Sequence, residues 1–248
     1  MPDCTVNGVR LSDFKRRAVE ARFDGGAITS DGGSLLLREV ERRTGLLHNV
    51  SRRLTDPRSP RRCRHDAASL LRQRVFGVAL GYCDLNDHGA LRSDAAFQTA
   101  VARDQPLASA STLCRFEQRA DTGFAWAAHA ALFERFVASF DTRPKRLTLD
   151  FDATDDRVHG EQDGRYFNGF YDGYCFLPLY VFCGDQLLVS YLRSAARHGA
   201  HHAAAILRLL VHALRARWPD VEIVLRADAG FCTPKILHAA QRLGVTSK

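Results

Sequence analysis

Two aspartates, Asp152 and Asp228, each end an alternating run of apolar and polar residues. In the first run, LTLDFDATDD (147–156), the apolar side chains fall on one face of an extended strand, while Asp150 and Asp152 fall on the other. In the second run, VEIVLRADAGF (221–231), Asp228 holds the matching position. Two carboxylates at neighbouring strand ends repel each other unless a cation lies between them. The pattern predicts a metal site, and the alternative is that each aspartate caps the turn after its strand.

The chemistry that such a site supports is phosphoryl transfer on DNA. Two divalent ions held by carboxylates activate a nucleophile and stabilise the leaving oxygen. Oxygen ligands suit Mg²⁺, with Mn²⁺ as a second possibility, and no Cys or His ligand is required. Asp150 is expected beside the site or in solvent. Asp155 and Asp156 belong to the same strand end as Asp152, so they cannot close the opposite side of a metal pair.

Positive charge is concentrated in the first part of the chain. The net charge is +7; residues 1–146 contain 24 Lys and Arg against 17 Asp and Glu, whereas residues 147–248 contain 11 of each. This asymmetry predicts that the first part meets a polyanion, and the alternative is a basic surface that only faces solvent. The candidate DNA-binding residues lie in an extended loop at 52–65 and on one face of a predicted helix at 109–120: Arg52, Arg53, Arg58, Arg61, Arg62, Arg64, Arg115, Gln118 and Arg119. For the helical face, a solvent-facing surface is the commoner case in proteins.

Periodicity predicts helices first and strands afterwards. Helices are expected at 30–45, 66–81, 109–120 and 123–140, and in the helix at 66–81 the stripe Leu71, Val75 and Val78 is expected in the core. Pro144 and Lys145 interrupt the pattern, which predicts a helical DNA-binding region at 1–145 and a second domain at 146–248. The order there is strand, strand (173–183), strand (186–193), helix (200–218), strand, helix (234–243), strand. This is the order of a ribonuclease H-like α/β domain with a mixed sheet and flanking helices.

Six aromatic residues lie between the first two expected strands or within the second. Their alternating positions predict a sheet core, and the alternative is a surface that stacks on a flipped base. The six are Tyr166, Phe167, Phe170, Tyr171, Tyr174 and Phe176.

Several long blocks in order make the chain resemble DDE transposases of bacterial insertion sequences, specifically the group thirteen-eighty branch of the insertion-sequence-four-like class. The blocks are GGAITSDGGSLLLRE (25–39), RHDAASLLRQRVFGVALGYCDLNDHGALRSD (64–94), LASASTLCRFEQR (107–119), LDFDATDDRVHGEQDGRYFNGFYDGYCFLPLYVFCGD (149–185) and LRADAGF (225–231).

The resemblance implies an enzyme that cuts and rejoins DNA with Mg²⁺. It places the family's first two catalytic aspartates on Asp152 and Asp228. The third acid, a glutamate in a motif of tyrosine, arginine, glutamate and lysine, does not occur after Asp228. The chain is therefore expected to be the front portion of a transposase, with a domain incomplete at its C-terminus. The alternative is an inactive fragment that binds transposon ends, or an inhibitor.

The partners implied are double-stranded DNA, as terminal inverted repeats and as target, and a homo-oligomer on DNA is compatible with the family. The first 17 residues contain no apolar run of signal-peptide length, and the longest apolar stretch, 175–183, is too short to span a bilayer. A cytoplasmic protein without a membrane partner is expected, associated with the bacterial nucleoid.

Overall fold

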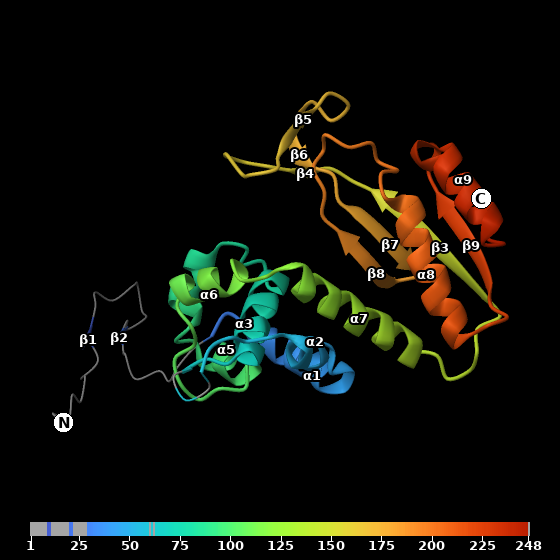
Figure 1. The fold of residues 1–248 in the computed structure, drawn as a ribbon. Helices are drawn as coiled ribbons and strands as arrows, with labels where there is room; N and C mark the ends of the chain where they lie inside the picture. Colours follow the sequence, from blue (N-terminus) through green and yellow to red (C-terminus); the bar gives the residue numbers. More distant parts are fainter. Residues whose placement is uncertain (1–8, 11–19, 22–28, 60, 62, 248) are drawn as a thin grey trace, which may run out of the picture. The chain divides into compact units, whose positions relative to one another are not determined.

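The computed structural model describes residues 9–10, 20–21, 29–59, 61 and 63–247. The chain divides into two compact units, Met1–Ala120 and Asp121–Lys248. Each unit has hydrophobic clusters of its own. In Figure 1 the described helices of the first unit run from blue to green and the second unit from green to red. The second compact unit begins at Asp121, whereas Pro144 and Lys145 predicted a domain boundary at residue 146.

The described part of the first unit is helical apart from one short antiparallel strand pair. Its buried cluster centres on Phe76, Leu91, Phe97 and Leu107. The elements are β1 (Val9–Arg10), β2 (Glu20–Ala21), α1 (Ser34–Thr44), α2 (Leu46–Arg53), α3 (Ala67–Ala79), η2 (Leu85–Asp87), α4 (His88–Leu91), α5 (Ala95–Ala100) and α6 (Ala110–Glu117).

Helix α3 forms where it was expected, but it buries a different face. The Asp66 side chain caps the helix by accepting the backbone N–H of Ser69 at 2.7 Å. The predicted core stripe is confirmed at Leu71, which is buried, and was wrong for Val75 and Val78, which are exposed at 38% and 47%. The buried side of the helix instead includes Phe76 and the polar Gln73, whose amide bonds both the N–H and the carbonyl of Ala108. Satisfying those backbone groups makes burial of a polar side chain acceptable.

The second unit is built on a mixed sheet whose central strand is β3 (Arg146–Ala153). Strand β7 (Leu179–Cys183) pairs antiparallel on one side of β3, and β8 (Gln186–Tyr191) pairs antiparallel with β7. Strand β9 (Glu222–Ala227) pairs parallel on the other side, followed by β10 (Thr246–Ser247). The order β8-β7-β3-β9-β10 and these polarities are those of a ribonuclease H-like sheet. The prediction of an α/β fold with a mixed sheet is confirmed.

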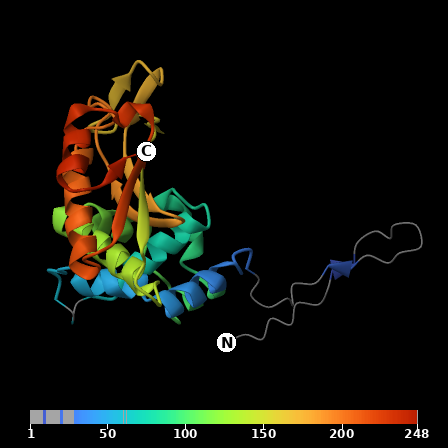
Figure 2. The ribbon, with the colours of Figure 1, turned by 90° about the vertical axis from the view of Figure 1, so that its right-hand side faces the viewer.

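Helices α7 (Thr122–Ala138), α8 (Ala203–Arg217) and α9 (Pro234–Arg242) share one core with the sheet. Figures 1 and 2 show α8 and α9 on the same face of the strands. The rings of Phe136 on α7 and Trp218 after α8 meet edge to face at 6.2 Å. Because α7 packs into this core, it belongs to the same unit as the sheet. The second unit therefore begins before α7, at Asp121, and not after it. No helix in the described ranges is both long and apolar enough to cross a membrane.

The strand expected at 173–183 is two strands in two sheets. Strand β6 (Gly173–Phe176) pairs with β4 (Asp156–Arg157) and β5 (Tyr166–Asn168), whereas β7 belongs to the large sheet. The break falls at Leu177 and Pro178, because proline has no N–H for a ladder. The small sheet projects from the end of the large sheet at which β3 terminates (Figure 1).

Candidate functional site

The parallel register of β3 and β9 brings Asp152 and Asp228 to the same end of the sheet. Phe151 of β3 pairs with Ala227 of β9, so the next residue on each strand is an aspartate. Along β3 the apolar residues are buried up to Phe151, and Asp152 is exposed, as the alternation predicted. The two predicted site residues are therefore neighbours across adjacent strands.

The side-chain carboxylate of neither aspartate forms a hydrogen bond or ion pair with another described residue. Asp228 precedes the single turn η3 (Ala229–Phe231), yet its side chain caps no N–H group there. The capping alternative therefore has no contact to support it at Asp228. Two exposed, unneutralised carboxylates at adjacent strand ends favour a bound cation.

Gly230 leaves space for the Asp228 carboxylate. A Cβ atom at position 230 would lie 3.0 Å from Oδ1 of Asp228 and 3.7 Å from its Cγ. A side chain there would push the carboxylate from its position, since real Cβ contacts are almost always longer. Gly230 of the RADAGF block thus allows the Asp228 carboxylate, two residues earlier, to keep its position.

Asp150 is neutralised by an arginine and does not join the pair. The Nη2 of Arg226 donates to Oδ2 of Asp150 at 2.7 Å, and its Nε donates to Oδ1. The hydrogen bond with Asp150 raises the pKa of Arg226. Asp150 and Arg226 are register partners on β3 and β9, which is why a two-pronged contact forms. Asp150 therefore lies beside the site, as expected.

The sequence patterns named Tyr171 only among the aromatic residues of 166–176 and did not connect it with the two aspartates. Burial raises its pKa, and the negative charges of Asp155, Asp152 and Asp228 raise it further. Tyr171 therefore lies within electrostatic range of all three carboxylates. Asp155 itself bonds Nε of Arg157 at 3.3 Å. Periodicity could not have connected Tyr171 with the aspartates, because it lies in the turn between β5 and β6 and the folding of that hairpin brings it into their electrostatic range.

The donor set fits a hard divalent cation in part. Asp152 and Asp228 supply carboxylate oxygens, which are the ligands that Mg²⁺ and Mn²⁺ prefer. Within the described ranges, no group of three or more His, Cys, Asp or Glu residues could hold a metal ion. Two protein ligands plus waters are compatible with Mg²⁺, which keeps several waters in protein sites.

The predicted DNA-binding residues of the basic loop differ in their contacts. Arg53, at the end of α2, donates to the carbonyl of Asn49, and Arg58 is paired with Asp56. The others in the loop that are described, Arg52, Arg61 and Arg64, are exposed, and Arg62 lies outside the described residues.

Helix α6 is shorter than the expected 109–120. It ends at Glu117, with Gln118 as its C-cap. The N–H of Arg119 bonds the carbonyl of Phe116, three residues back, so the last turn tightens and Arg119 lies beyond the helix. Arg115 is exposed and contacts Thr112 Oγ1 at 3.4 Å. The face of Arg115 and Gln118 persists, whereas Arg119 does not continue it.

The expectation that the aromatic residues at 166–176 form a sheet core was wrong for four of them. Tyr166, Phe167, Phe170 and Tyr174 are exposed, and Phe170 is the most exposed at 89%. Among the described residues of the second unit, no helix lies over the small sheet (Figure 1), so its alternation leaves aromatic rings in solvent. The ring of Tyr174 contacts Phe167 edge to face and carries the guanidinium of Arg165 at 4.7 Å. This arrangement favours the alternative, an aromatic contact surface.

The chain belongs to the transposase DDE domain group 1 family, whose model matches residues 11–247. A comparison with curated proteins gives no match.

Two solved structures are similar, both of complexes of the Mos1 transposase. One is a paired-end complex with the left transposon end, at 10% identity and a TM-score of 0.29, covering 78% of this chain and 60% of that one. The other is a pre-cleavage transpososome, at 10% identity and a TM-score of 0.28, covering 89% and 78%. The chain thus spans 60% of the length of the first, and at these TM-scores the likeness defines neither fold nor site.

Proposed function

We propose that the protein is a DNA transposase of an insertion sequence, from the group thirteen-eighty branch of the insertion-sequence-four-like class, which cleaves and transfers DNA strands. The observation that carries this proposal is the register of β3 and β9, which sets Asp152 beside Asp228 with neither side chain neutralised. Membership of the DDE family supports the same reaction.

In this proposal, Asp152 and Asp228 hold Mg²⁺, with Mn²⁺ as a substitute. When bound, the metal would supply Lewis acidity for activating water, and then a DNA 3′ hydroxyl, and for stabilising the leaving oxygen. Arg226 neutralises Asp150 and so keeps a third negative charge from the pair on this face. Gly230 leaves Asp228 room to turn towards the ligand. The chain's own contribution is thus two carboxylates held at fixed strand ends.

The first unit would bind double-stranded DNA, both the terminal inverted repeats and the target. The basic excess of the first part and the exposed arginines of the loop support this role. Assembly of a homo-oligomer on DNA and a place at the bacterial nucleoid follow from the same proposal.

The metal assignment is tested by titrating the purified protein with Mn²⁺ and measuring the heat of binding by calorimetry. Asp152→Asn and Asp228→Asn should each weaken Mn²⁺ binding by at least about tenfold, because even supporting residues around a metal commonly change affinity that much. Asp185→Asn, an exposed carboxylate in the turn between β7 and β8, is the matched control and should bind as the wild type does. Unchanged binding in both site variants would remove Asp152 and Asp228 from the proposal.

A second candidate function is a chain that binds transposon ends without cutting them, and so competes with an active relative. The observation that favours it is that no third carboxylate, His or Cys completes a metal-binding group within the described ranges. Catalysis of strand cleavage requires tightly held ligands on both sides of the metal pair.

Nicking of DNA separates the two functions. The substrate is a supercoiled plasmid carrying the DNA that flanks the coding sequence. If the wild-type protein nicks this plasmid in Mn²⁺ and the Asp228→Asn variant does not, the protein is a transposase. Binding with steep salt dependence but without nicking in either Mg²⁺ or Mn²⁺ establishes the second candidate.

A further inference from the structure

A cavity of about 600 Å³ lies within the first unit, between the basic loop and the start of α6. The walls come from three segments: the loop after α2, the residue after α4, and the first turn of α6. Among the described residues, no acidic side chain lines it. The loop and the helix, which the sequence singled out separately, therefore meet at one cavity. Its principal lining residues are Arg58, Arg64, His65, Arg92, Ser109 and Thr112.

Two of the lining arginines have no partner for their guanidinium groups. Neither Arg64 nor Arg92 forms an ion pair or a side-chain hydrogen bond with another described residue. The backbone carbonyl of Arg92 accepts bonds from Leu107 and Gln98, which hold the base of that side chain in place. Like charges gathered without a counter-charge are unfavourable, and a bound anion removes that cost.

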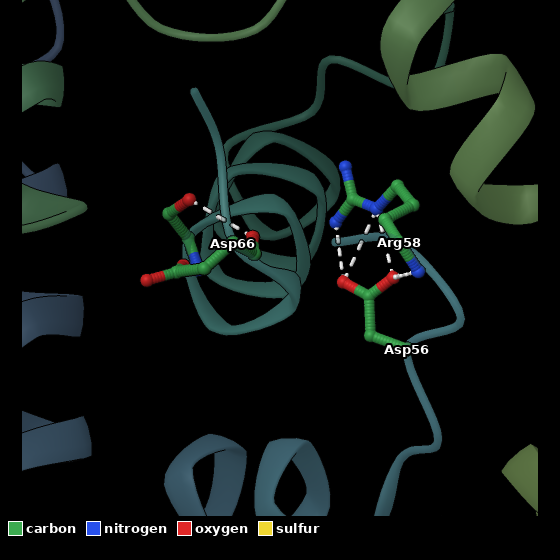
Figure 3. Close-up of polar contacts among 4 residues, drawn as sticks. Asp56, Arg58 and Asp66 are labelled. Atoms are coloured by element: carbon green, nitrogen blue, oxygen red, sulfur yellow. Dashed lines mark hydrogen bonds and ion pairs between the residues drawn. The ribbon is translucent and has the colours of Figure 1, made fainter. Parts of the chain in front are cut away.

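The carboxylates whose charges act on Arg58 are already engaged. Asp56 binds Arg58 through Nη2–Oδ2 at 2.6 Å and Nε–Oδ1 at 2.8 Å. Asp66 caps α3 through the N–H of Ser69. Figure 3 shows both arrangements, with the guanidinium of Arg58 forked on Asp56 and Asp66 bonded at the start of its helix. Arg58 is thus held rigidly at the wall, while Arg64 and Arg92 remain available to a ligand.

His65 lines the cavity beside Arg64 and is subject to the positive charge of several arginines. Burial lowers its pKa, and the charges of Arg103, Arg64, Arg92 and Arg58 lower it further. Four guanidinium groups therefore act on one imidazole at the cavity wall. A neutral imidazole can still donate one hydrogen bond to an anion.

The start of α6 adds backbone donors. Ser109 holds the N-cap position, but its hydroxyl contacts the hydroxyls of Ser111 and Thr112, each at 3.1 Å, and caps no N–H group. The N–H groups of Ala110 and Ser111 have no acceptor among the described residues. Uncapped N–H groups and the partial positive charge of a helix start favour a phosphate.

We propose that this cavity is a phosphate-binding site, in which Arg64 and Arg92 pair with a phosphate group and the first turn of α6 donates hydrogen bonds to it. A cavity of this volume exceeds one phosphate group, so it admits a phosphate together with the sugars attached to it. In the proposed transposase, on which this inference rests for its ligand, the phosphate belongs to the DNA backbone. A free phosphorylated compound shares the same chemistry.

Two measurements test the site on the whole chain. Inorganic phosphate binding is followed by calorimetry at constant ionic strength in chloride, and duplex DNA binding is followed as a function of salt. Arg92→Gln and Arg64→Gln should each weaken phosphate binding by about tenfold, the size of a lost charge-assisted hydrogen bond. Each should also lower the slope of log affinity against log salt by about one, the loss of one phosphate contact.

Arg208→Gln, an exposed arginine of α8 in the second unit, is the control for loss of one positive charge. It should leave phosphate binding and the salt slope unchanged. Arg92→Lys should retain most phosphate affinity, since the charge is kept. If Arg92→Gln does not fold, Arg64→Gln decides, because Arg64 is exposed and its guanidinium has no partner to lose.

The outcomes separate this site from the proposed function. Phosphate affinity equal to the wild type in both Gln variants would overturn the site. Lost phosphate binding with an unchanged DNA salt slope would overturn the DNA backbone as the source and leave a free phosphorylated compound. If the wild type binds phosphate but no duplex DNA, the proposed function fails, and the phosphate titration still decides the cavity.

Discussion

The guanidinium of Arg226 on β9 binds both carboxylate oxygens of Asp150 on β3, two positions before Asp228 and Asp152 on the same strands. Three acidic residues thus lie at this end of two neighbouring strands, and one of them is neutralised. The ion pair leaves two unneutralised carboxylates on adjacent strands, which is the arrangement that a divalent cation would bridge.

The two charges of this ion pair should each affect the affinity of the site for a metal ion. Arg226→Gln removes a positive charge near Asp228 and frees Asp150, so Mn²⁺ should bind roughly twofold more tightly, as screened Coulomb attraction suggests. Asp150→Asn should weaken binding by a similar factor. The double variant restores the net charge and should return close to wild type in a calorimetric double-mutant cycle. Equal affinities in all four proteins would show that the pair does not act on the site.

Gly230→Ala should disturb the site without unfolding the protein. The added Cβ would lie 3.0 Å from Oδ1 of Asp228, so the carboxylate must move. We expect Mn²⁺ affinity to fall several-fold, with a melting temperature close to wild type, because position 230 is exposed. Gly169→Ala has no atom within 4 Å of its Cβ and should leave both quantities unchanged. A Gly230→Ala protein with wild-type metal binding would contradict the role of this glycine.

Gly77→Ala should destabilise the first unit by about 1–3 kcal/mol, the usual cost of overpacking. Its Cβ would lie 2.7 Å from Cε1 and 2.9 Å from Nε2 of the buried His88 ring. Gly89→Ala, one residue after His88, meets nothing within 4 Å and is the control. Urea unfolding measures the difference, and equal midpoints for the two variants would show that the ring can move aside.

Acid should destabilise the first unit through His88. Burial lowers its pKa below the ordinary 6.5, and the charge of Arg74 lowers it further. The unfolded chain therefore binds the proton more readily, and stability present above pH 6.5 is lost as the pH falls towards the folded-state pKa. Melting temperatures across this window measure the slope.

The His88→Gln variant should show a shallower decline with falling pH than the wild type. Some decline should persist, because burial also lowers the pKa of His65 and of His201. An identical slope in the two proteins would assign the effect to those residues.

Phe170→Ala should weaken the binding of single-stranded DNA if the exposed aromatic residues of the small sheet stack on bases. Phe170 is 89% exposed, so its removal should not affect folding. Stacking on one base is worth about 1–3 kcal/mol, which corresponds to roughly a tenfold loss of affinity. Leu36→Ala, a 72% exposed apolar residue of α1, controls for loss of exposed apolar area. Fluorescence anisotropy with a short oligonucleotide gives the affinities.

Local pattern alone was sufficient for most elements of the second unit. Alternation located β3 and β9, Pro234 begins α9, and the Gly184-Asp185 turn joins β7 and β8. These features depend on side-chain periodicity and on backbone preferences of single residues, which neighbours in sequence decide. For the same reason, the sequence alone was sufficient to predict Asp152 and Asp228 as a pair at the ends of two strands.

Tertiary structure decided which residues meet and which faces are covered. Helix α7 joined the second unit because its aromatic residues pack against Trp218, and Val75 lies in solvent although it follows helical spacing. A hairpin brings Tyr171 into electrostatic range of the aspartates, and Arg92 joins Arg64 at one cavity although 28 positions separate them. The sequence of a segment indicates which of its side chains can be buried and which can bind a ligand. Which other segment it packs against depends on the free energy of contacts between residues far apart in the chain, and a local pattern carries no information about those contacts.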